Sequence, residues 1–150
     1  GEGLERVKDK LRKQELIDPV IHRLLVKAGL LIEGKAKERA PVDTGRLRGS
    51  IKTEVAPMMV TIGPTVFYGP HVEFGTRPHW PPLSAMQPWA MRHGFPAGRA
   101  GAFLVARAIA RHGTRPQPYM RPAAEESLDE IKDFAEEAGR EIEERWKSGA

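Results

Sequence analysis

The sequence predicts an α+β fold in which an antiparallel β meander is covered by two long helices. Near both ends of the 150-residue chain, apolar residues recur every three or four positions, the spacing of amphipathic helices. Between them, residues 46–76 alternate apolar and polar side chains, as half-buried strands do. A proline-rich segment, residues 77–121, separates the meander from the last helix. The length suits a single domain spanning residues 1–150.

The N-terminal region, residues 4–39, is predicted to be helical in two pieces. Charged residues surround the apolar positions of a short amphipathic helix over 4–15. A second helix should span 19–39, with Asp18 as N-cap and Pro19 at the first helical position. Gly29 and Gly34 fall inside this helix. They indicate either the close approach of another backbone or simply tolerated glycines.

A turn should follow at Pro41, which disfavours a helical conformation at the residue before it. Asp43, Thr44 and Gly45 have the chemistry of a turn. Three runs of alternating residues, at 46–55, 58–62 and 66–76, then predict a three-stranded antiparallel meander, with a four-stranded one as the alternative. This meander should present one apolar face to the 19–39 helix and to a C-terminal helix over 122–147.

Residues 77–121 contain seven prolines and are predicted to form an arm with short helices near 83–92 and 101–111. Aromatic residues, Met and Arg are enriched in the cores of protein–protein interfaces. The arm is therefore expected to pack on neighbouring subunits, although a small helical hairpin on the same subunit would also fit. The expected interface anchors are Trp80, Met86, Trp89, Phe103, Tyr119 and Arg121.

Charge is distributed unevenly along the chain. Residues 57–121 hold seven Arg and one acidic residue, whereas residues 122–150 hold four basic and ten acidic residues. Opposite charges on one chain favour pairing, within the subunit or with a neighbour. Two separately solvated surfaces are the alternative.

Contact with nucleic acid is a further hypothesis. Arg46, Arg48 and Lys52 would share the polar face of the first predicted strand, where they could touch DNA phosphates without reading sequence. No DNA-binding motif accompanies them. These arginines could equally pair with Glu residues of an adjacent subunit.

The sequence offers little for catalysis or metal binding. The chain has no cysteine, and His71, Glu73 and His79 do not have the spacing of an established zinc motif. It also lacks a nucleophile elbow and a phosphate-binding glycine loop. We expect no catalytic residue, no cofactor and no metal. No apolar run reaches the roughly 20 residues of a membrane span, and the charged N-terminus is unlike a signal peptide, so no membrane partner is expected.

Three motifs carry a resemblance to a known family. They are Pro41 to Arg48 followed by Ser50-Ile51, then Tyr68 with Val72 to Thr76, and finally Pro118 to Ala123. Together, in this order, they resemble the small neck or tail-completion proteins of long-tailed bacteriophages, a family of tail components named for gene product ten of a lambdoid phage. The segment between Thr76 and Pro118 is longer here than in the family's short members.

The resemblance implies a structural, non-enzymatic virion protein of the phage neck, made in the host cytoplasm. Such proteins form homo-oligomeric rings, here expected as a hexamer or dodecamer, between the head connector or adaptor and the tail terminator or tail tube. DNA would pass through the lumen without sequence-specific contact. A tail-terminator ring, a free-standing DNA-binding module and a metal-dependent enzyme are the alternatives. The residues expected to fix the fold are Pro41, Asp43, Thr44, Gly45, Arg46, Leu47, Tyr68, Glu73, Phe74, Gly75 and Thr76.

Overall fold

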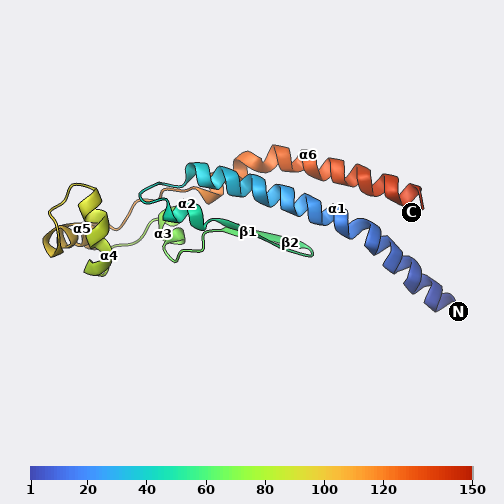
Figure 1. The fold of residues 1–150 in the computed structure, drawn as a ribbon, viewed down its shortest axis with the longest axis horizontal. Helices are drawn as coiled ribbons and strands as arrows, with labels where there is room; N and C mark the ends of the chain where they lie inside the picture. Colours follow the sequence, from blue (N-terminus) through green and yellow to red (C-terminus); the bar gives the residue numbers. More distant parts are fainter. Residues whose placement is uncertain (150) are drawn as a thin grey trace. The chain divides into compact units, whose positions relative to one another are not determined.

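The computed structural model describes residues 1–149 and contains six helices and one β-hairpin in that range (Figure 1). The chain groups into two compact units. The first unit combines residues 1–39, 51–63 and the chain from Met120 onward, and the second combines residues 40–50 and 64–119. In chain order the elements are α1 (Glu2–Arg39), α2 (Arg46–Ser50), β1 (Lys52–Ala56), β2 (Met59–Gly63), α3 (Gly69–Phe74), α4 (Leu83–Arg92), α5 (Arg99–His112) and α6 (Met120–Lys147).

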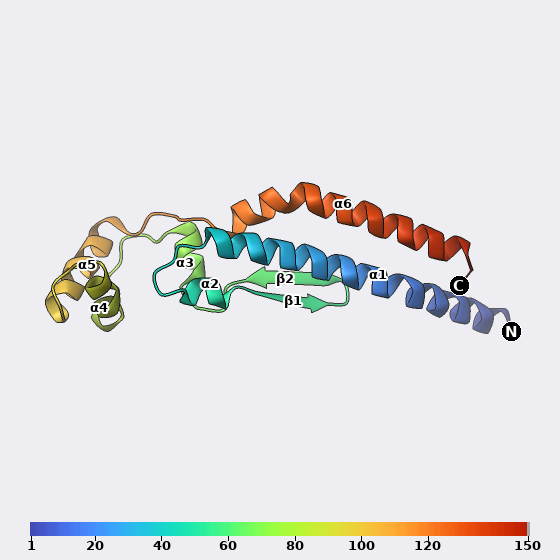
Figure 2. The same ribbon diagram turned by 45° about the horizontal axis from the view of Figure 1, so that its top comes forward.

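The first unit is organised around α1 and α6, which lie side by side in both ribbon views (Figures 1 and 2). A row of ion pairs joins the two helices. Successive basic residues along α1 meet successive acidic residues of α6 in reverse order, as expected of antiparallel helices. The pairs are Arg23–Glu141, Lys27–Glu137, Lys35–Glu130 and Arg39–Glu126. Much of the acidity of the C-terminal helix is thus balanced within the first unit.

The hairpin of β1 and β2 packs against α1. Its antiparallel register places Thr53 opposite Ile62 and Val55 opposite Val60. A Cβ atom added at Gly29 of α1 would lie 2.5 Å from Thr53 Cγ2 and 2.8 Å from Val60 Cγ2. Gly29 therefore marks a close approach between helix and hairpin, made here by strand side chains.

The predicted three- or four-stranded meander is wrong, because the structure has a two-stranded sheet. The two expected cover helices also differ in position. The hairpin lies on one side of α1 and α6 lies on the other (Figure 2). The long N- and C-terminal helices and the α+β class are confirmed.

The predicted break between helices at 4–15 and 19–39 is also wrong, since α1 continues through Pro19. An internal proline removes one backbone hydrogen bond and costs roughly 3 kcal/mol. Contacts with α6 support α1 on both sides of Pro19: the Lys13 ammonium lies over the Trp146 ring, and Arg23 pairs with Glu141. Tertiary packing therefore keeps α1 helical through Pro19, a position that looks like a helix start in the sequence.

The first predicted strand, 46–55, is wrong in its first half, where the chain forms the short helix α2. Gly49 N–H donates to Gly45 O at 2.9 Å, and Leu47 and Ser50 are buried three residues apart. Leu47 and Ile51 are apolar at a spacing of four. That spacing fits a strand face and a helix face equally, which explains the error.

The third predicted strand, 66–76, is replaced by α3. Pro70 falls at the start of this helix, a position that proline favours. Thr76 alone makes an isolated antiparallel bridge, with Thr114. The two short helices predicted in the arm are confirmed as α4 and α5, which pack together, and the predicted C-terminal helix is confirmed as α6.

Candidate functional site

The turn at residues 41–50 is built from local hydrogen bonds in the second unit. Gly45 has φ of 80°, a conformation that favours glycine. The Arg46 N–H donates to Thr44 Oγ1 at 3.4 Å, and α2 begins there. At the other end of α2, Thr65 donates to the Ser50 carbonyl oxygen from its N–H at 3.0 Å and from its hydroxyl at 2.9 Å. The turn is thus fixed at both ends.

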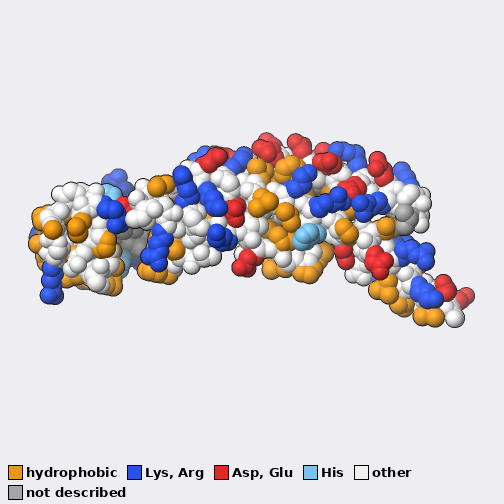
Figure 3. Space-filling view, viewed as in Figure 1, with side chains coloured by type: hydrophobic (Ala, Val, Ile, Leu, Met, Phe, Trp, Pro, Cys, Tyr) orange, Lys and Arg blue, Asp and Glu red, His pale blue; other side chains and the backbone are white. Residues whose placement is uncertain are grey.

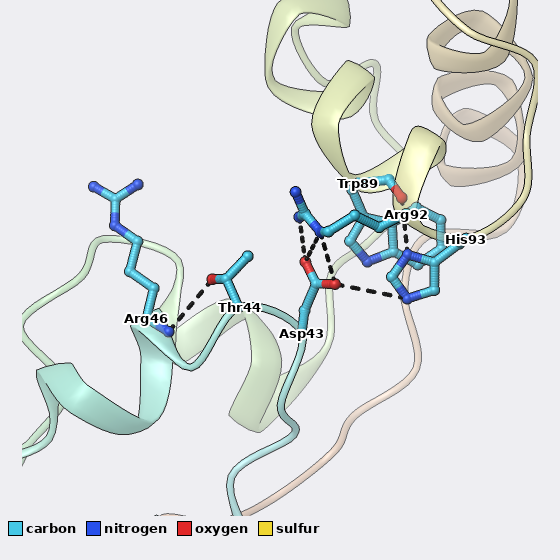
Figure 4. A network of polar contacts seen from close by, with 6 residues as sticks. All are labelled: Asp43, Thr44, Arg46, Trp89, Arg92 and His93. Carbon is cyan, nitrogen blue, oxygen red and sulfur yellow. Dashed lines mark hydrogen bonds and ion pairs between the residues drawn. The ribbon is translucent and has the colours of Figure 1, made fainter.

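Asp43 of this turn binds the arm directly (Figure 4). Arg92 of α4 donates from Nε to both carboxylate oxygens, at 3.0 and 3.1 Å, and also from Nη2. These hydrogen bonds hold the pKa of Asp43 below its ordinary 3.8 and raise the pKa of Arg92. His93 Nε2 lies 3.9 Å from Asp43, and its ring stacks on Trp89 with centroids 3.9 Å apart. The motif aspartate therefore anchors the turn to the end of α4.

The second motif, around Tyr68 to Thr76, closes the base of the arm. Glu73 is buried, and its Oε2 accepts a hydrogen bond from the Tyr119 N–H at 2.6 Å. The Tyr119 hydroxyl donates to Gly69 O at 2.8 Å. Burial, and secondarily the charge of Glu73, raise the pKa of Tyr119 to about 12. Gly75, with φ of 71°, has no room for a side chain beside Thr114 O.

The expected interface anchors differ in their exposure. Trp80, Trp89 and Phe103 are exposed, and the rings of Trp80 and Phe103 contact each other at 5.9 Å between centroids. Met86 is half-buried, and Arg121 is exposed but pairs with Glu125. Tyr119 is completely buried within the second unit, where it holds Gly69 and Glu73. Its contacts are therefore internal to the subunit.

The three basic residues expected to face DNA do not share a strand face. Arg46 and Arg48 lie on α2, where positions two apart point to different sides of a helix, and Lys52 begins β1. For metals, no group of three or more His, Cys, Asp or Glu residues that could hold an ion occurs among residues 1–149. Across the same range, no helix is both long enough and apolar enough to cross a bilayer.

Comparison with known proteins bears on the same two motifs. Residues 2–75 match the family described as "Bacteriophage HK97-gp10, putative tail-component". This match assigns residues 2–75 to the HK97 gp10-like family. The match includes α1, the turn, the hairpin and α3, and it ends at Gly75 where the arm begins. No curated protein and no solved structure matches the chain.

The HK97 gp10-like region and the arm meet in contacts that the sequence did not reveal. Asp43 and Glu73 lie inside the family match, whereas their partners Arg92 and Tyr119 lie outside it. Partners separated by 46 and 49 residues leave no local signal in the sequence. A turn aspartate and a buried glutamate could be suspected, but only the fold identifies what they bind.

Proposed function

We propose that this HK97 gp10-like tail component is a structural protein of the phage neck. Identical subunits would form a closed ring that joins the head connector to the tail and lets DNA pass. Two facts support the proposal. One is the family match. The other is the number of large apolar side chains that the subunit leaves exposed, because extensive exposed apolar surface is typical of interaction sites.

That exposed surface carries the argument for assembly. The buried hydrophobic residues are mostly alanines, whereas many of the largest side chains lie outside. Phe67 is 82% exposed, Phe74 75% and Trp80 62%, and aromatic residues are common anchors in interfaces. The exposed large side chains of the second unit are Val42, Phe67, Phe74, Trp80, Trp89, Met91, Phe95, Phe103 and Leu104.

The experiment is a deletion in the phage that encodes the chain. Loss of the gene should leave DNA-filled heads and separate tails in electron micrographs, and supply of the wild-type protein should restore joined particles. Phe103→Asp should fail to restore them, whereas the exposed control Thr61→Asp on β2 should succeed. Joined, infectious particles in the deletion strain would overturn the proposal. A tail terminator is distinguished by the phenotype of overlong tails.

A free-standing DNA-binding module is the second candidate, and one observation favours it. Residues 77–121 contain seven Arg and no acidic residue, and electrostatic contacts with phosphate dominate non-specific DNA binding. Such a module should bind duplex DNA as a monomer, with affinity that falls steeply as salt rises. Fluorescence anisotropy across a salt series would test this candidate, and absence of binding at low salt would rule it out.

A further inference from the structure

Helix α5 has an unusual distribution of side chains between its two faces. Its buried face consists of Gly101, Ala102, Val105 and Ala106, which allow a close approach to α4 and the loop before α5. A Cβ atom at Gly101 would lie only 1.9 Å from Pro96 O. The large apolar residues are on the outside instead, where Phe103 and Leu104 are each 45% exposed.

Three arginines border this apolar pair: Arg99, Arg107 and Arg111, all exposed. We call these five residues the basic face of α5. At about 100° per residue, they fall on one side of the helix. No acidic residue occurs anywhere in the arm, and none of the three arginines has an ion-pair partner among residues 1–149. A complementary surface must therefore be acidic and partly apolar.

Helix α6 carries such a surface on the side that its contacts with α1 leave open. Glu126, Glu130, Glu137 and Glu141 are used in the ion pairs with α1. Asp129, Asp133 and Glu136 recur at spacings of four and three, so they share one side of α6, next to the glutamates that pair with α1. The exposed Lys132 and Arg140 lie on the same side, where the acids outnumber them. We call these three the acidic face of α6; all are exposed, and the part of the chain that the structure describes gives them no ion-pair partner.

The acidic face lies on an accessible part of the first unit. Acidic side chains, with Lys and Arg among them, line the edge of α6 that faces away from α1 (Figure 3). Leu128, the residue before Asp129, is 53% exposed. It could supply an apolar contact beside the charges, as Phe103 and Leu104 do on α5.

The geometry points to one occupant for the basic face of α5: the acidic face of α6 from a second copy of the chain. This inference rests on the proposed function and names the contact between its subunits. At about 1.5 Å per residue, Arg107 and Arg111 are about 6 Å apart along α5, and Asp129 and Asp133 are about 6 Å apart along α6. The two stripes can therefore align pair by pair.

The contact would join two different surfaces. A copy that uses one of its two faces in a contact would therefore still have the other face free to bind a further copy. Contacts of this kind propagate from copy to copy and close into a ring when the rotation permits. Bound DNA would account for less of the exposed surface. Its phosphates would pair with the arginines of α5, but the acidic face and Leu128 would remain without a partner. A second copy accounts for both surfaces together.

A charge exchange tests the contact on the full chain. One variant, Arg107→Glu/Arg111→Glu, reverses the basic face, and another, Asp129→Lys/Asp133→Lys, reverses the acidic face. Each alone should weaken self-association by at least about tenfold, because like charges across an interface are strongly unfavourable. An equimolar mixture of the two should associate again, since each reversed face then meets an opposite charge on the other variant.

The masses are measured by sedimentation velocity over a concentration series at low salt, with circular dichroism as the check that each variant folds. Lys10→Glu/Arg12→Glu, on the exposed start of α1, makes the same change in net charge as Arg107→Glu/Arg111→Glu but at other residues, and it should associate like the wild type. Recovery in the mixture, with the control unchanged, supports the contact.

Three outcomes overturn it. Wild type and both reversed variants associating equally would place the contact elsewhere while leaving the ring function intact. Wild type remaining monomeric at every concentration would remove this self-contact, and the deletion phenotype would decide the neck function separately. Loss of binding to a duplex probe in Arg107→Glu/Arg111→Glu, with mass unchanged, would assign the basic face to DNA.

Discussion

The two units of the molecule differ in how their charged side chains are paired. In the first unit, basic residues of α1 and acidic residues of α6 meet in a row of ion pairs. In the second unit, Arg92 is held by Asp43, while Arg99, Arg107 and Arg111 face outward with no acidic residue in the arm. The first unit therefore pairs its charges mainly where α1 meets α6, whereas the second unit leaves these three arginines exposed.

Their interiors differ as well. Two long helices and a hairpin pack through small residues such as Ala28, Gly29 and Ala36 in the first unit. The second unit has short helices tied together by a few specific contacts, above all those of Tyr119 and Asp43. We therefore expect stability in the first unit to be spread along the helices and stability in the second to be concentrated at individual residues.

The largest effect should come from Tyr119→Ala. A fully buried aromatic side chain would be lost, which typically costs about 3–5 kcal/mol. Tyr119→Phe removes only the hydroxyl that donates to Gly69 O and should cost about 1 kcal/mol. Urea unfolding followed by circular dichroism gives both values. A loss below about 1 kcal/mol for Tyr119→Ala would contradict the concentration of stability at this residue.

The difference in stability between the wild type and Tyr119→Phe should depend on pH. Because burial raises the pKa of Tyr119 to about 12, folding favours the protonated phenol. The stability of the wild type relative to Tyr119→Phe should be constant below pH 10 and should fall as the pH rises from 10 toward 12. Unfolding curves across this range measure the difference, and a flat profile would argue against a buried hydroxyl.

Two glycines of α1 offer a matched comparison within the first unit. Gly29→Ala gains helix propensity but places a methyl group against Thr53 and Val60, so overpacking of about 1–3 kcal/mol should make it destabilising. Gly34→Ala has open space around it and should stabilise the protein by about 0.5–1 kcal/mol. Thermal unfolding distinguishes them. If both variants changed the stability in the same direction, the close approach of the hairpin at Gly29, and not at Gly34, would be contradicted.

Reversal of one ion pair between α1 and α6 should have a smaller effect. Lys27→Glu places two acids together at Glu137, yet exposed pairs contribute only about 0–1 kcal/mol. The double variant Lys27→Glu/Glu137→Lys should recover the loss, and added salt should reduce it. A loss well above 1 kcal/mol would show that single pairs, and not the whole row, hold the helices together.

The subtlest effect concerns Asp43. Its pKa lies below 3.8 because Arg92 donates hydrogen bonds to it, so its contribution should be complete above pH 3.8 and lost only as the pH falls through the depressed pKa. Carboxyl chemical shifts from NMR should show a midpoint below 3.8 in the wild type. Arg92→Gln should return that midpoint toward 3.8. An unchanged midpoint would contradict the hydrogen bonds from Arg92 to Asp43 that connect the turn to the arm.

Local chemistry in the sequence was sufficient for much of this protein. The long terminal helices, the two arm helices, the β1–β2 hairpin and the family could be predicted, because helical spacing, turn residues and a motif in fixed order are properties of neighbouring residues. Periodicity failed where two patterns coincide, at Leu47 and Ile51, and where proline has two meanings, at Pro19 and Pro70.

Only the tertiary structure decided which residues meet. The partners of Asp43 and Glu73 lie more than 40 residues away in the arm, and the acids of α6 divide into those facing α1 and those facing outward. Composition could show that basic and acidic segments exist, but not which charges are already paired. Pairing depends on distance in three dimensions, and the free energy of a charge follows from its neighbours in space.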